Sequence, residues 1–137
     1  METHTGDAGP LRPHLHEGVY AFARRAPGLG LDGLLAGLDV VATMREEEGL
    51  TLVLPLERAR AAGLEVLFEA AWITLKTTSA LDAVGLTASF SAALATAGIS
   101  CNVIAGASHD HIFVGVARGE EARRILAGLE WDAAGGD

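Results

Sequence analysis

Residues 72–116 read WITLKTTSALDAVGLTASFSAALATAGISCNVIAGASHDHIFVGV, and this stretch decides the fold. Residues 72–78 are aromatic and β-branched with alternating polarity, which predicts a half-buried strand. From Leu86 the apolar residues recur at helical spacing, and Gly98 has the position of a helix-terminating glycine. The stretch therefore begins with a strand followed by a helix.

Strand character returns at 101–107 and again at 111–116. A short connection, Ser108-His109-Asp110, separates the two and predicts an antiparallel hairpin. The handedness rule for crossovers predicts that strands 72–78 and 101–107 are parallel. With a further helix over Gly119–Leu129, this half of the chain reads β-α-β-β-α.

The preceding residues, 18–71, repeat that order. We expect strands at 19–24, 40–45 and 50–54, short helices at 31–37 and 56–62, and an extended segment at 65–71. The similarity between the halves is one of pattern more than of identity, and it indicates an internal duplication. The second copy lacks a fourth strand, because residues 130–137 are too polar and glycine-rich to form one. That strand is either absent or supplied by another part of the chain or by a partner.

Composition excludes several functional classes. The 10 basic and 18 acidic residues give a net charge of −8, which argues against a nucleic-acid partner. A single cysteine, Cys101, excludes an internal disulfide and is typical of the cytoplasm. No apolar run is long enough to span a membrane, and the first residues do not resemble a secretory signal.

Two further elements carry a family resemblance. The element Asp82-Ala-Val-Gly85-Leu86, followed by a helix that ends in Ala97-Gly98-Ile99-Ser100-Cys101-Asn102, resembles the ACT domain. Many members carry proline where this chain has Val84. The whole chain is similar to small bacterial proteins that consist of two ACT-like halves. The resemblance implies an α+β, ferredoxin-like βαββαβ fold, with a mainly antiparallel sheet and helices on one face.

The candidate ligand site is the loop Ser79–Gly85 together with the start of the strand at 100–103. A helix that begins near Leu86 presents free backbone N–H groups and a partial positive charge to a carboxylate. Gly85 allows close approach of the ligand, and Asp82 can meet an ammonium group. The resemblance implies the ligand-binding residues Asp82, Val84, Gly85, Leu86 and Asn102. Alternatively, Asp82 only caps the helix or shapes the loop.

His109 and His111 form a second constellation. Two histidines at positions i and i+2 of a strand share a face, as a metal site requires. A metal needs at least three ligands, and the other pair with this spacing, His14 and His16, lies in a segment expected to be mobile. Glu46–Glu48 is expected to be a solvated turn.

These observations favour a non-enzymatic, cytoplasmic regulatory protein that binds a small ligand, an amino acid, without any cofactor. We expect a flexible arm at 1–17, ACT-like halves at 18–71 and 72–130, and a tail at 131–137. A homodimer, or pairing of the two halves, would cover the edge left by the missing strand. The alternatives are a structural, protein-interaction module without a ligand, or a small metal-binding protein that uses His109 and His111.

Overall fold

The computed structural model describes residues 9–27, 36–77 and 80–131. Contacts divide the chain into two compact units. We call Glu17–Ala70 the inserted unit, and Met1–His16 with Ala71–Asp137 the host unit. Strand β6 (Glu65–Leu75) crosses the boundary, so its first six residues belong to the inserted unit and its last five to the host unit.

The inserted unit contains β3 (Tyr20–Arg25), β4 (Ala42–Glu46), β5 (Gly49–Pro55), α1 (Leu56–Ala61) and the start of β6, with strand order β4-β5-β3-β6. Its pairings are antiparallel, and a turn at Glu47 and Glu48 joins β4 to β5. Alternate residues of β3 and β5 point inward and pack with α1; this core contains Ala21, Ala23, Leu52, Leu54, Leu56 and Ala59. The predicted helix at 31–37 lies mostly outside the described residues.

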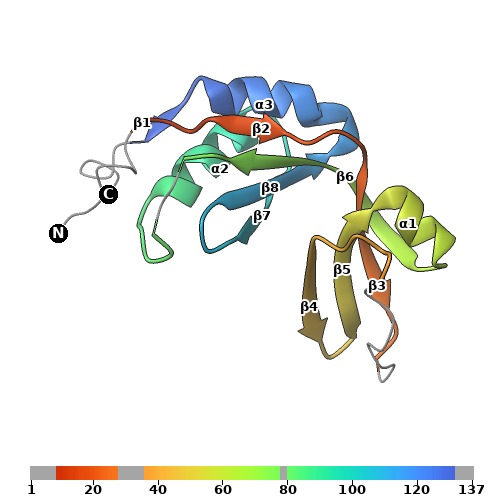
Figure 1. Cartoon of the computed structure of the whole chain (residues 1–137). Coiled ribbons are helices and arrows are strands. Elements are labelled where there is room, and N and C mark those ends of the chain that lie inside the picture. Colours follow the sequence, from red (N-terminus) through yellow and green to blue (C-terminus); the bar gives the residue numbers. More distant parts are fainter. Residues whose placement is uncertain (1–8, 28–35, 78–79, 132–137) are drawn as a thin grey trace. The chain divides into compact units, whose positions relative to one another are not determined.

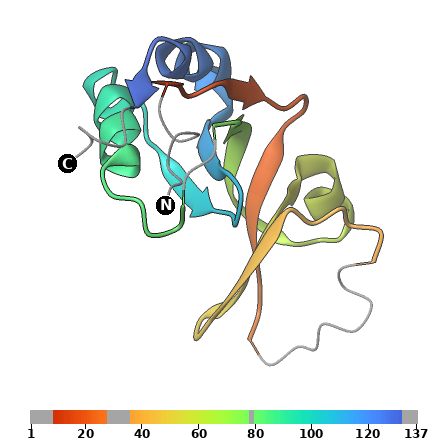
Figure 2. The ribbon, with the colours of Figure 1, turned by 60° about the vertical axis from the view of Figure 1, so that its left-hand side comes forward.

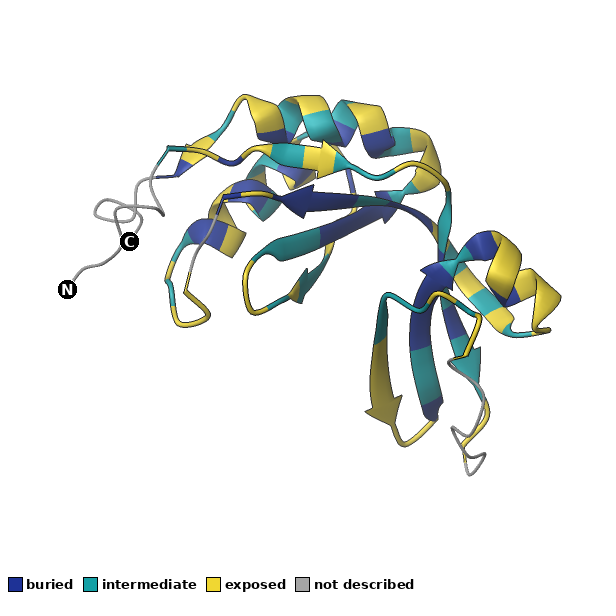
Figure 3. Ribbon diagram, viewed as in Figure 1, coloured by how far each residue is buried: buried dark blue, intermediate teal, exposed yellow. Residues whose placement is uncertain are grey.

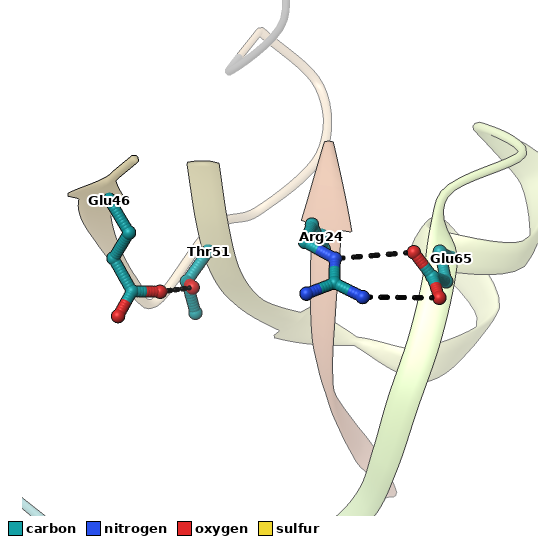
Figure 4. Close-up of polar contacts among 4 residues, drawn as sticks. All are labelled: Arg24, Glu46, Thr51 and Glu65. Carbon is teal, nitrogen blue, oxygen red and sulfur yellow. Dashed lines mark hydrogen bonds and ion pairs between the residues drawn. The ribbon is translucent and has the colours of Figure 1, made fainter. Parts of the chain in front are cut away.

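Polar contacts tie neighbouring strands of the inserted unit together at its surface (Figure 4). The Arg24 guanidinium donates to both carboxylate oxygens of Glu65 on β6, at 3.3 and 3.4 Å. The Thr51 hydroxyl on β5 donates to Glu46 on β4 at 2.7 Å. These pairs are exposed, so each contributes at most about 1 kcal/mol to stability.

The host unit contains the end of β6, then α2 (Leu86–Thr96), β7 (Asn102–Ala105), β8 (Asp110–Gly115) and α3 (Gly119–Ala127), with a short 3₁₀ turn at Val116–Arg118. The hairpin β7–β8 is antiparallel, as predicted. Strand β8 lies between β6 and β7, so the two strands that were expected to be parallel are not neighbours.

Helices α2 and α3 lie side by side over one face of the host sheet (Figure 1, Figure 2). Each helix has one buried stripe and an exposed opposite side (Figure 3). The buried residues share one core with alternate residues of β6 and β8; it includes Ile73, Leu75, Leu86, Phe90, Leu94, Ile112, Val114 and Leu126. Leu86, Phe90, Leu94, Val114 and Leu126 are thus core residues, whereas Ile104 of β7 is not. Ile104 is only half-buried, because its partner in register is His111, which faces away from the helices.

The fourth strand of the host unit comes from the N-terminal segment. Strand β2 (Pro13–Leu15) pairs antiparallel with β6, with Pro13 opposite Leu75 and Leu15 opposite Ile73. The preceding Leu11 is only 1% exposed and belongs to the host core. This part of the segment expected to be a mobile arm is thus ordered, because the free edge of β6 supplies backbone partners.

Strand β1 (Gly9–Pro10) pairs with β9 (Glu130–Trp131). Residues 130–131 were judged too polar for a strand, yet Trp131 is only 4% exposed and packs in the core. Each unit therefore has the strand content of a ferredoxin-like fold, and the predicted α+β class with a mainly antiparallel sheet is confirmed.

Candidate ligand-binding site

Helix α2 begins at a glycine whose conformation few other residues adopt. Gly85 is the N-cap residue, with φ of 101° and ψ of −22°. Leu86, next in the chain, is 4% exposed and anchors the first turn in the core. The first intrahelical hydrogen bond joins the Ser89 amide to the Gly85 carbonyl at 3.0 Å. The amides before Ser89 therefore point out of the helix start, as in any helix.

No side chain caps these amides. The N-cap makes no side-chain hydrogen bond, and the first turn of α2 contains no acidic residue. Asp82 is exposed in the turn before Gly85, so it is not the helix cap. The helix start is electrostatically suited to an anion, because nothing in its own first turn neutralises the helix dipole.

The loop before α2 is unusually apolar for an exposed segment. Leu81 and Val84 are 71% and 72% exposed, and Asp82 lies between them. A turn in which the Ala83 amide donates to the Ala80 carbonyl at 3.0 Å shapes this part of the loop. Ser79, the predicted start of the site, lies outside the described residues. The loop thus presents one carboxylate, two apolar side chains and the amides of α2.

Asn102 lies at the other end of α2. It is the first residue of β7, is exposed, and donates from Nδ2 to the Phe113 carbonyl at 3.5 Å. Helix α2 has 11 residues and is about 16 Å long. The structure therefore brings Asp82, Val84, Gly85 and Leu86 together but leaves Asn102 apart from them within one chain.

The histidines have hydrogen-bond partners rather than a shared metal geometry. His109 Nδ1 lies 3.3 Å from the Thr77 carbonyl oxygen, whereas His111 Nδ1 lies 3.0 Å from Thr74 Oγ1. Within residues 9–27, 36–77 and 80–131, no group of three or more His, Cys, Asp or Glu side chains is placed to hold a metal ion. The metal-binding alternative therefore lacks a third ligand there.

Sequence reasoning missed the proximity of His16 to His111. Strand β2 places His16 beside β6, where its Nε2 lies 2.8 Å from Thr74 Oγ1. Its ring stacks on Trp72, with centroids 3.6 Å apart and an interplanar angle of 8°. Burial lowers the pKa of His16 to about 4, and the neighbouring His14, Lys76 and His111 act in the same direction. The sequence signal for this proximity was that His14 and His16 are two residues apart, as are His109 and His111.

The inserted unit contains a cavity of about 370 Å³. The start of β3, the end of β5 and the first turns of α1 line it, with Glu17, Glu57 and Arg60 as its charged side chains. Arg60 is paired with Glu69 at 3.3 Å. The cavity is separate from the Asp82 loop, which belongs to the host unit.

Cys101 is half-buried, and burial raises the pKa of its thiol. A thiol of this kind stays protonated at neutral pH, so it is a poor nucleophile. None of the helices in the described part of the chain is long and apolar enough to cross a membrane.

Comparisons with known proteins support the same fold in both halves. Residues 9–71 and 67–127 each match a family model described as an ACT domain. No curated protein sequence matches the chain.

Among solved structures, a protein of unknown function from Vibrio cholerae, described as a possible transport protein, is 47% identical with a TM-score of 0.79. The match covers 86% of this chain and 88% of that one. A protein from Agrobacterium tumefaciens is 23% identical, with a TM-score of 0.67 and coverage of 86% and 87%. The ligand-free regulatory subunit of aspartate kinase from Thermus thermophilus is 13% identical, with a TM-score of 0.63 and coverage of 86% and 93%. The last two share the fold.

Proposed function

Since this chain belongs to the ACT-domain family, we propose that it is a regulatory protein that binds a small carboxylate ligand, an amino acid, and catalyses no reaction itself. Ligand binding shifts the population between two arrangements of the protein. A partner protein responds to that shift. The fold shared with a regulatory subunit of aspartate kinase supports a regulatory role of this kind. We place the protein in the cytoplasm, in keeping with its single free cysteine.

The observation that carries the proposal is the uncapped start of α2. A carboxylate placed there accepts hydrogen bonds from the first-turn amides and meets the positive end of the helix dipole. Gly85 has no side chain to obstruct the ligand, and no acidic side chain of the first turn competes with it.

The other groups of the loop suit the rest of an amino acid. Asp82 carries the charge that an ammonium group requires, and it is exposed within the same loop. Val84 supplies apolar surface for a ligand side chain. A ligand that has both a carboxylate and an ammonium group therefore satisfies the helix start and Asp82 together.

Asn102 reaches this ligand only from a second copy of the chain, because α2 separates it from the loop within one copy. We therefore propose a homodimer in which Asn102 of the partner subunit faces the Asp82 loop. Strand β7 lies at the end of the strand order of the host sheet, so its outer edge is the natural place for a second copy to pair.

Calorimetric titration with each of the twenty amino acids tests the proposal. For an amino acid that binds, Asp82→Asn should weaken affinity by about 1–3 kcal/mol, the range for losing a charged hydrogen-bond partner. Glu47→Gln is the matched control, because Glu47 is an exposed acid in the inserted unit, and His109→Ala is a second. The proposal fails if no amino acid binds, or if Asp82→Asn and Glu47→Gln have equal effects.

The exposed Leu81 and Val84 favour one other function, a protein-interaction module without a ligand. Light scattering on the wild type and on Val84→Asp separates the two. A change of mass in Val84→Asp, combined with absence of amino-acid binding by the wild type, supports the interaction module. Amino-acid binding by the wild type supports the ligand site, and there Val84→Asp should also weaken the dimer, because Val84 lies in the loop that faces the partner subunit.

A further inference from the structure

The cavity of the inserted unit lies where the start of β3 meets the first turn of α1. The Leu56 amide donates to the Val19 carbonyl at 2.9 Å, and Tyr20 lies opposite Pro55 in the pairing of β3 with β5. Helix α1 packs against both strands beside this point (Figure 1). The volume of about 370 Å³ falls within the range of small-molecule sites, about 300–1,000 Å³. The cavity is therefore large enough for a small ligand.

Apolar groups form the more buried part of the lining. Leu56 is 8% exposed and belongs to the core of the inserted unit, and Val19 packs against that core. Pro55 and Tyr20 are half-buried and also line the cavity. Burial raises the pKa of Tyr20, and Asp39 acts in the same direction, so the phenol carries no charge at neutral pH. This part of the cavity suits a hydrocarbon chain.

The exposed part of the lining has an excess of negative charge. Glu17 and Glu57 are both exposed, and both line the cavity. Among the residues that the structure describes, no ion pair involves either carboxylate. Arg60 also lines the cavity, but its guanidinium is paired with Glu69 at 3.3 Å. Two carboxylates are therefore left to attract a cation.

We propose that this cavity binds a small aliphatic amine, with its hydrocarbon chain along the apolar lining and its ammonium group at Glu17 and Glu57. A carboxylate or a phosphate fits poorly for two reasons. Glu57 lies in the first turn of α1, where it offsets the positive end of the helix dipole. The cation of the lining, Arg60, already has Glu69 as its partner. An anion would therefore meet two carboxylates without a free cation to balance them.

This site is independent of the amino-acid site proposed in the host unit. The first turn of α2 contains no acidic residue, whereas the first turn of α1 contains Glu57. The two regions therefore favour ligand groups of opposite charge. The chain would respond to two ligand classes, each bound by its own unit, and the failure of either proposal leaves the other unaffected.

Amide chemical shifts of the full, ¹⁵N-labelled chain test the proposal with three probes of equal chain length. Pentylamine has one ammonium group, cadaverine has one at each end, and pentanoate has a carboxylate instead. Both amines should shift the amides of Gly18, Leu56 and Glu57, which line the cavity, and cadaverine should bind several-fold more tightly. Pentanoate should leave these amides unchanged. Absence of shifts with both amines, or equal shifts with pentanoate, would overturn the proposal.

Charge variants test whether the two carboxylates hold the amine. Glu17→Gln and Glu57→Gln should each weaken cadaverine binding about threefold, the strength of an exposed ion pair. Arg60→Gln should strengthen binding, because it removes a like charge and releases Glu69 from its ion pair. Glu47→Gln is the matched control, since Glu47 is an exposed acid of the same unit that does not line the cavity. An effect of Glu47→Gln equal to that of Glu17→Gln would show that only the net charge attracts the amine, and would refute the site.

Discussion

Replacing Gly85 by alanine should destabilise the protein, because α2 begins with this residue at φ of 101°. An L-residue in the left-handed region costs about 1–2 kcal/mol relative to the right-handed one. Alanine also restricts the unfolded chain, which offsets about 0.4–1 kcal/mol of this cost. The net expected loss is about 1 kcal/mol.

Gly128→Ala is the matched control, because Gly128 caps the end of α3 at φ of −85°. A Cβ there would lie 3.6 Å from the Ile125 carbonyl oxygen, an ordinary contact. Only the effect on the unfolded chain remains, so this variant should gain about 0.4–1 kcal/mol. The two Gly→Ala changes should therefore have opposite signs.

Urea denaturation, followed by circular dichroism, measures both variants against the wild type. A Gly85→Ala protein as stable as the wild type, or more stable, would show that the helix start does not require the left-handed conformation. The prediction also affects how the ligand site is tested. A change at Gly85 alters the helix start as well as ligand access, so Asp82→Asn is the cleaner test of binding.

Two further predictions concern the host core. Phe90→Ala should cost about 3–5 kcal/mol in urea denaturation, because Phe90 is fully buried; a loss below about 1 kcal/mol would contradict the position of α2. Leu11→Ala should cost about 2–5 kcal/mol although it precedes every predicted strand, and a neutral effect would mean that this segment is not part of the core in solution.

The sequence alone predicted the elements whose signals are local. Helix α2 has an apolar period and a glycine just beyond each end, and the β7–β8 hairpin has alternating strands and a short turn. These patterns reflect backbone conformation and the burial of one face, which act among neighbouring residues. The element Asp82-Ala-Val-Gly85 was recognisable for the same reason.

The tertiary structure decided the elements that form only by pairing across the chain. Strands β1, β2 and β9 have two or three residues each, too few to show a period, and they are rich in proline and polar residues. They are strands because β6 leaves an edge open beside β2, and because Trp131 and Leu11 fill the host core. The separation of Asn102 from Asp82, and the meeting of His16 with His111, likewise depend on which strands are neighbours. Backbone hydrogen bonds between distant segments determine which strands are neighbours, and no short stretch of sequence predicts those bonds.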